Sequence, residues 1–315
     1  MKKKIRKSTA RGHQQVSDIQ IGDIVDVVSP GSASKIEDVE RALQVIRSWG
    51  LMPRLPKDSF ADHPFHSNFD SERLRHLKNA FYAKDSSFIW CVRGGYGSNR
   101  LLLDLAKLKK PKKKKLLLGY SDITSLHLFL NQNWKWPSWH APTIESLISN
   151  KLPSDQIDEL KNLIFGKIKS QEFQLNPINS QAKKKQAVNG ELTGGNLTVL
   201  ASTIGSSVSL RAAGKILVLE DIGERGYRID RHLWQLRFSG ALKSCKAIVF
   251  GDFINGDEPD GKNFIDFAIE RFASEVTIPC FRGLAMGHAN QNRVVPLGVK
   301  ARITDGRIQV ETGLG

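Results

Sequence analysis

The sequence lacks the features that mark membrane, disulfide-bonded and zinc proteins. No stretch of its 315 residues approaches the roughly 20 apolar residues needed to cross a bilayer. Its three cysteines, Cys91, Cys245 and Cys280, are too few and too scattered for a disulfide framework or a zinc site. Cys91 and Cys245 stand in or beside apolar runs, which is typical of small core residues. We therefore expect a reduced, cytoplasmic protein with no part in a membrane.

The basic N-terminus is not followed by an apolar segment, so we expect no secretory signal and instead a disordered lead over residues 1–20. The net charge is +15, and much of it lies in three basic runs: residues 2–11, 107–115 and 183–185. No aromatic residues interleave with these runs, as a surface for single-stranded nucleic acid would need. Solvated loops are the simpler interpretation, and nucleic acid is not an expected partner.

The first half of the chain alternates between strand and helix patterns. The predicted strands are 23–28, 51–55, 88–92 and 116–120, and the predicted helices are 35–49, 71–83, the segment after Ser98, and 122–131. This alternation favours a parallel sheet covered on both faces. Ligands bind at the carboxyl ends of the strands in such sheets. The loops at 29–34, 94–98 and 120–124 lie at such ends, so we expect them to converge.

The second half is less regular and has no internal repeat. Its predicted strands include 214–219, 247–253 and a pair over 294–303 broken at Gly298, and its predicted helices are 229–238 and 264–273. A helix at 154–167 is predicted before the boundary between the halves. The stretch 170–185 is polar and contains a proline, which is typical of a linker. We predict an α/β protein with an N-terminal domain at 21–170, a linker at 171–188 and a smaller C-terminal α/β domain at 189–315.

One glycine-rich segment, Arg-Gly-Gly-Tyr-Gly-Ser-Asn-Arg at 93–100, joins a predicted strand to a predicted helix. Its glycines allow a sharp turn and a close ligand. A serine on such a turn has the geometry of a nucleophile elbow, which makes Ser98 the candidate nucleophile. Ser98 could equally be a helix N-cap, and the turn could be a phosphate loop.

A serine nucleophile needs a base and an acid that orients the base. His288 lies in a glycine-marked loop before a strand, whereas most other histidines lie in helical or polar contexts. Glu220 ends a buried strand, where an unpaired carboxylate would cost several kcal/mol. Its neighbour Asp221 competes for the role, since one of the two points inward. The alternatives are an ordinary loop histidine and a structural ion pair.

Several motifs, in this order, resemble the LD-carboxypeptidase family of serine peptidases. They are RGGYGS at 93–98, GYSDIT at 119–124, GGNL at 194–197, LED at 219–221, the segment 227–231, and Gly287-His288 ahead of 296–298. The resemblance covers about residues 20–310. That family includes muramoyltetrapeptide carboxypeptidases and microcin-immunity peptidases, and its N-terminal half resembles the flavodoxin-like sheet of class I glutamine amidotransferases.

The resemblance implies a catalytic triad of Ser98, Glu220 and His288, with an oxyanion hole formed by the N–H groups of Gly95 and Asn99. It implies release of terminal D-alanine from a murein tetrapeptide substrate, with no metal or other cofactor, by a homodimer that acts in peptidoglycan recycling.

Further residues in the matched motifs are candidates for holding the substrate. Arg93, Ser121, Asn196 and Arg231 could bind its terminal carboxylate, and Tyr96 and Tyr227 could wall the pocket. For Arg231 an ion pair with Glu220, Asp221 or Asp230 is an equal alternative, and for Tyr227 half-buried packing is another.

Two other functions stay open. One is an immunity-type peptidase that cleaves peptidyl or aminoacyl adenylate analogues. Such enzymes stack the nucleotide base on an aromatic residue in a region after the linker, and no tryptophan stands in that region here. The other is a non-catalytic relative that binds polyanions through residues 107–115.

Overall fold

The computed structural model describes residues 16–17, 19–149, 152–184 and 186–315. Most of the predicted disordered lead, with the basic run at 2–11, lies outside the described residues. Two described residues of that lead differ from the prediction, because Val16 and Ile19 are each only 1% exposed. Val16 forms a bridge with Leu314, so the two ends of the described chain meet in the core of the N-terminal domain.

The N-terminal domain is built on a six-stranded sheet in the order β12-β5-β4-β3-β1-β2. Its strands are β1 (Ile24–Val28), β2 (Met52–Arg54), β3 (Ser86–Cys91), β4 (Leu116–Gly119), β5 (Ser138–His140) and β12 (Val295–Leu297). The first five run parallel and β12 pairs antiparallel with β5. The strand–helix alternation therefore predicted the parallel sheet correctly.

Helices cover both faces of this sheet, as the alternation predicts. One face packs on α1 (Ile36–Ser48) and α5 (Ser154–Ile164). The other packs on α2 (Asp70–Tyr82), α3 (Leu102–Leu105) and α4 (Thr124–Phe129). The helix predicted after Ser98 begins as a short 3₁₀ turn, η1 (Ser98–Leu101), and the one predicted over 122–131 begins as another, η2 (Ser121–Ile123).

The C-terminal domain has an eight-stranded sheet in the order β6-β14-β13-β8-β9-β10-β11-β7. Its strands are β6 (Ser170–Gln174), β7 (Asn176–Pro177), β8 (Val188–Asn196), β9 (Lys215–Ile222), β10 (Ala247–Ile254), β11 (Cys280–Arg282), β13 (Lys300–Thr304) and β14 (Arg307–Glu311). The central strands β8 to β11 are parallel. One face packs on α6 (Leu197–Ser202), α7 (Gly226–Phe238) and α8 (Ile265–Ser274).

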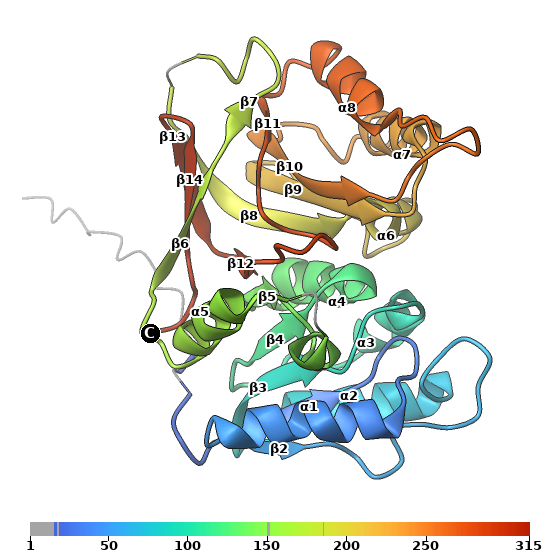
Figure 1. Cartoon of the computed structure of the whole chain (residues 1–315), viewed down its shortest axis with the longest axis vertical. Helices are drawn as coiled ribbons and strands as arrows, with labels where there is room; N and C mark the ends of the chain where they lie inside the picture. Colours follow the sequence, from blue (N-terminus) through green and yellow to red (C-terminus); the bar gives the residue numbers. More distant parts are fainter. Residues whose placement is uncertain (1–15, 18, 150–151, 185) are drawn as a thin grey trace, which may run out of the picture.

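The domain boundaries differ from those predicted. The predicted linker contains β6 and β7, which are edge strands of the C-terminal sheet. The predicted strand pair at 294–303 divides between the domains, because β12 joins the N-terminal sheet while β13 stays in the C-terminal one. Figure 1 shows β12 between the two domains, beside β5. The chain thus returns to the N-terminal sheet directly after the loop that holds His288.

Two further observations bear on the composition. The three cysteines are buried free thiols, which confirms the core interpretation of Cys91 and Cys245. None of the helices in the described part of the chain is long and apolar enough to span a membrane.

Candidate active site

Three loops meet at the carboxyl edge of the N-terminal sheet, as the sequence predicts. The N–H of Ser32 donates to the carbonyl of Gly94 (3.0 Å), and the N–H of Tyr96 donates to Oγ of Ser32 (3.1 Å). A Cβ on Gly94 would lie 2.9 Å from Cβ of Ser121. Glycine is therefore required at this position, because the loop after β3 lies directly against the turn after β4.

Ser98 does not occupy the position that a nucleophile needs. Its side chain is completely buried, and its Oγ lies 2.5 Å from both the carbonyl oxygen of Asp122 and Oγ of Ser125. The carboxylate of Asp122 accepts the N–H groups of Gly97 (3.1 Å) and Ser98 (2.8 Å). Ser98 therefore fastens the glycine-rich turn to the start of α4. The structure disagrees here with the predicted nucleophile, because a substrate carbonyl cannot reach this hydroxyl.

Ser121 has the geometry that was predicted for Ser98. It stands two residues after the end of β4, begins the helical segment η2, and is only half-buried. Its φ is +64°, a left-handed conformation that costs a residue with a Cβ about 1–2 kcal/mol. Strain of this kind at the turn from a strand to a helix defines a nucleophile elbow.

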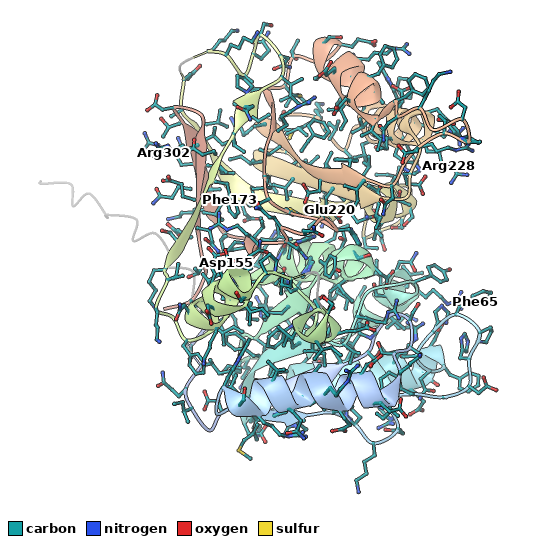
Figure 2. The ribbon with its side chains drawn as sticks, in the orientation of Figure 1. Phe65, Asp155, Phe173, Glu220, Arg228 and Arg302 are labelled. Carbon is teal, nitrogen blue, oxygen red and sulfur yellow. The ribbon has the colours of Figure 1, made fainter. Side chains whose placement is uncertain are left out.

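The predicted pairing of histidine and glutamate is present. Nδ1 of His288 lies 2.8 Å from Oε2 of Glu220, which is completely buried at the end of β9. Burial opposes ionisation of Glu220, but His140 and His288 hold its pKa down to about 2. Glu220 is therefore an anion at neutral pH, able to orient His288 and to stabilise its protonated form. Figure 2 shows Glu220 at the junction of the two domains.

Asp221 points to the opposite face of β9, so the choice between the two acids falls on Glu220. Its carboxylate accepts hydrogen bonds from Nδ2 of Asn196, from the N–H and hydroxyl of Thr198, and from the N–H of Ile222, all at 2.8–2.9 Å. Burial nevertheless raises the pKa of Asp221 to about 6. Asp221 is thus a structural acid that ties β8 and α6 to β9.

Tyr120 connects the histidine to the elbow. Its ring centroid lies 4.9 Å from that of His288, and Tyr120 directly precedes Ser121. The pairing of β12 with β5 further anchors the loop of His288 on the N-terminal sheet. Through Tyr120, the segment that carries Ser121 therefore lies against His288 at the boundary between the domains.

His140 is a site residue that sequence reasoning missed. It ends β5 opposite Gly119 of β4, and its Nε2 lies 3.8 Å from Oε1 of Glu220. The only available signal was its place at the carboxyl end of a parallel strand, and the tryptophans around it suggested a plain closing segment.

The structure places the other predicted oxyanion and carboxylate residues as follows. Gly95 is exposed beside Ser32, with a φ of +86°. Asn99 follows the buried Ser98 on η1. Arg93 donates to the carbonyl of Ala33 (3.1 Å). The side chain of Asn196 caps α6 and donates to Asp221, so both of its ends already bind the protein.

The aromatic candidates are exposed. Tyr96 is 49% exposed and packs on His66 at 5.3 Å. Tyr227 is 44% exposed, and Arg231 lies over its ring at 5.3 Å. Among the described residues, Arg231 forms no ion pair with Glu220, Asp221 or Asp230 and instead joins the arginines around the ring of Tyr227, which is about half exposed.

One cluster in the described part of the chain has the spacing of a metal site, formed by Asp58, Glu72 and His76. Arg75 already supplies a cation there. Its guanidinium pairs with Asp58 and Glu72 and lies 3.0 Å from Nε2 of His76. These residues are therefore satisfied by an internal arginine and fit a metal poorly.

A strained serine elbow on a parallel sheet, with a histidine held by a buried glutamate, is the arrangement of an α/β serine hydrolase. The N-terminal domain model of the LD-carboxypeptidases matches residues 25–141, and the C-terminal domain model matches residues 189–303. The chain belongs to the LD-carboxypeptidase family, whose members are serine-type carboxypeptidases.

Named relatives agree with this assignment. A putative carboxypeptidase of Rickettsia conorii is 38% identical over 76% of this chain and 75% of its own. The murein tetrapeptide carboxypeptidase of Pseudomonas aeruginosa is 32% identical over 90% of this chain and 94% of its own. The crystal structure of muramoyltetrapeptide carboxypeptidase from Oxalobacter formigenes superposes with a TM-score of 0.78 at 30% identity, covering 91% of this chain and 97% of that one.

The same fold occurs in a microcin self-immunity protein solved with aspartyl sulfamoyl adenosine. It superposes with a TM-score of 0.76 over 95% of this chain and 98% of that one. The identity is 19%, so this likeness concerns the fold alone.

Proposed function

We propose that this protein is a serine LD-carboxypeptidase that releases terminal D-alanine from murein tetrapeptide, with Ser121 as nucleophile, His288 as base and Glu220 as the acid that orients it. The main support is the hydrogen-bonded pair of His288 and the buried Glu220. His288 packs against Tyr120, which directly precedes the strained, half-buried Ser121. The murein-related names of two relatives of at least 30% identity support this substrate.

The proposed reaction runs through an acyl-enzyme. Nδ1 of His288 is engaged by Glu220, so Nε2 is the nitrogen that takes the proton of Ser121 as its Oγ attacks the carbonyl carbon of the L-centre. The protonated His288 then donates this proton to the nitrogen of D-alanine as the C–N bond breaks. A water molecule, deprotonated by His288, hydrolyses the ester and restores Ser121.

The change of nucleophile also changes the proposed oxyanion hole. In an elbow, the N–H of the residue after the nucleophile is one donor, which is Asp122 here. The N–H of Gly95, an exposed residue next to Gly94 on the loop packed against Ser121, is the second proposed donor. Asn99, the donor expected beside Ser98, follows that buried serine and drops out of the proposal.

Arg93 is the proposed partner of the substrate's terminal carboxylate. It precedes Gly94, which lies directly against Ser121. Its side chain is 40% exposed, with Nε 3.6 Å from a carboxylate oxygen of Glu145. Five N–H donors in a planar fork can hold a second acceptor alongside these contacts.

Incubation with L-Ala-D-Glu-diaminopimelate-D-Ala is expected to yield the tripeptide and one D-alanine, seen by mass spectrometry as the loss of a single residue. The matched control carries L-alanine at the C-terminus and should remain intact, because the proposed site selects a D-centre after an L-centre. Equal cleavage of both peptides, or of neither, would contradict the proposed specificity.

The immunity-type alternative predicts hydrolysis of an aminoacyl sulfamoyl adenosine instead of the tetrapeptide. The low identity to the microcin self-immunity protein and the murein names of closer relatives favour the tetrapeptide. The same mass-spectrometric assay with both compounds decides between them, and turnover of either would exclude a non-catalytic polyanion-binding relative.

We also propose that the protein is a homodimer in the cytoplasm, where fragments of peptidoglycan are recycled. The family resemblance supports the dimer, and three buried free thiols accord with a reducing compartment. Light scattering is expected to give twice the 35.2 kDa chain mass, and a mass of one chain at micromolar concentration would refute the dimer.

A further inference from the structure

His140 is completely buried on the N-terminal sheet, yet neither of its ring nitrogens has a hydrogen-bond partner within the described part of the chain. This is unusual, because buried polar atoms are almost always paired. His127, another completely buried histidine of the same domain, pairs one of its two nitrogens: its Nε2 lies 2.8 Å from the carbonyl oxygen of Gly119, whereas its Nδ1 has no partner among the described residues. The position of His140 therefore requires a different explanation from packing alone.

Glu220 also lacks a hydrogen bond, on one of its two carboxylate oxygens. Its Oε2 contacts His288 at 2.8 Å, while its Oε1 is buried and has no hydrogen-bond partner among the described residues. The nearest cationic or donor group recorded for Oε1 is Nε2 of His140, at 3.8 Å. An approach of about 1 Å would bring this pair to the length of a charge-assisted hydrogen bond, about 2.7–2.9 Å. Two unsatisfied groups thus face each other across the domain boundary.

We propose that His140 is a positioning residue whose Nε2–H holds Oε1 of Glu220, so that Oε2 stays directed at His288. A buried carboxylate with one bonded oxygen can rotate, whereas two bonds from opposite sides fix its plane. The inference rests on the proposed roles of Glu220 and His288. It also makes the orienting acid depend on both domains, because His140 belongs to the N-terminal sheet and Glu220 to the C-terminal one.

Tyr120 gives the arrangement a second link. Its ring centroid lies 5.7 Å from that of His140 and 4.9 Å from that of His288, so the tyrosine before the elbow contacts both histidines. Displacement of His140 would therefore disturb Glu220 directly, and His288 through both Glu220 and Tyr120. A loss of turnover with little change in substrate binding is the expected consequence.

The test compares three replacements of His140. Glutamine keeps an N–H donor close to the position of Nε2, asparagine places it one methylene short, and leucine removes it. Relative to wild type, His140→Leu and His140→Asn should lower kcat for tetrapeptide cleavage roughly 100-fold with KM changed less than about threefold, a size typical of lost orientation. His140→Gln should recover kcat to within about tenfold. Thermal unfolding identifies any variant that does not fold.

A substrate-independent readout separates this inference from the proposed function. The Nδ1–H of His288 bonded to Glu220 should give a downfield proton resonance, assigned by its absence in His288→Gln. His140→Gln should keep this resonance and His140→Asn should shift or lose it, whether or not the wild-type protein releases D-alanine. An unchanged resonance in folded His140→Asn or His140→Leu, or equal kcat in the glutamine and asparagine variants, would overturn the positioning role.

Discussion

Replacing Ser121 with alanine is expected to abolish D-alanine release, with kcat falling by a factor of about 10⁴–10⁶, as when the nucleophile of a serine hydrolase is removed. The half-buried Ser121 supplies the hydroxyl at the strained turn after β4, whereas the neighbouring Thr124 and Ser125 are completely buried. Mass spectrometry of the tetrapeptide measures the loss. Labelling with a fluorophosphonate, followed by peptide mapping, should mark Ser121 in the wild type and nothing in the variant.

Ser98→Ala is the matched control, because it removes the hydroxyl that the sequence predicts to be the nucleophile. This hydroxyl bonds Asp122 and Ser125 inside the protein, so its loss should cost about 1–3 kcal/mol of unfolding free energy, the usual range for breaking a buried hydrogen bond. Turnover should stay within about tenfold of wild type. A fully active Ser121→Ala together with an inactive, folded Ser98→Ala would return the nucleophile to Ser98.

The sequence pattern pointed to Ser98, whereas the geometry favours Ser121 as the proposed nucleophile, and the difference has a physical reason. Glycines signal positive φ, so the segment at 93–98 carries the stronger elbow pattern. The real strain lies on Ser121, a residue with a side chain, and tertiary packing imposes it. No local pattern shows that Asp122 will accept the N–H groups of the glycine turn and bury Ser98 beneath it.

For the rest of the site, too, some features could be predicted from the local sequence, whereas others depend on contacts between distant segments. The pairing of Glu220 and His288 was predictable, because a buried acid at a strand end requires a partner. The crossing of β12 was not predictable, because a short apolar run broken by Gly298 fits either sheet. His140 was missed for a related reason: its partner lies in the other domain, 80 positions along the chain, at a distance that only folding defines.

Glu220→Gln is expected to lower kcat by roughly 10³–10⁴ while preserving shape, since the loss of an orienting carboxylate costs about this much in serine hydrolases. Glutamine cannot stabilise the protonated His288 and can present an amide to Nδ1, which favours the wrong tautomer.

The same replacement should also change the pH dependence of the free energy of unfolding. Because the pKa of Glu220 is depressed to about 2, its ionised form stabilises the fold above its unfolded pKa of about 4.3, and this stabilisation disappears as the pH falls toward 2. The variant should therefore be less stable at neutral pH and show a flatter acid dependence in thermal unfolding.

Asp221→Asn distinguishes the two adjacent acids. This carboxylate accepts four hydrogen bonds on the far side of β9, and an amide nitrogen in its place cannot accept those that face it. The variant should lose stability by about 1–3 kcal/mol but keep kcat within about tenfold, because Asp221 does not contact His288. The two variants can be compared directly, because each replaces a carboxylate by the corresponding amide and the two residues are adjacent on β9. If the Asp221→Asn variant were stable but inactive while Glu220→Gln stayed active, Asp221 rather than Glu220 would be the acid that orients His288.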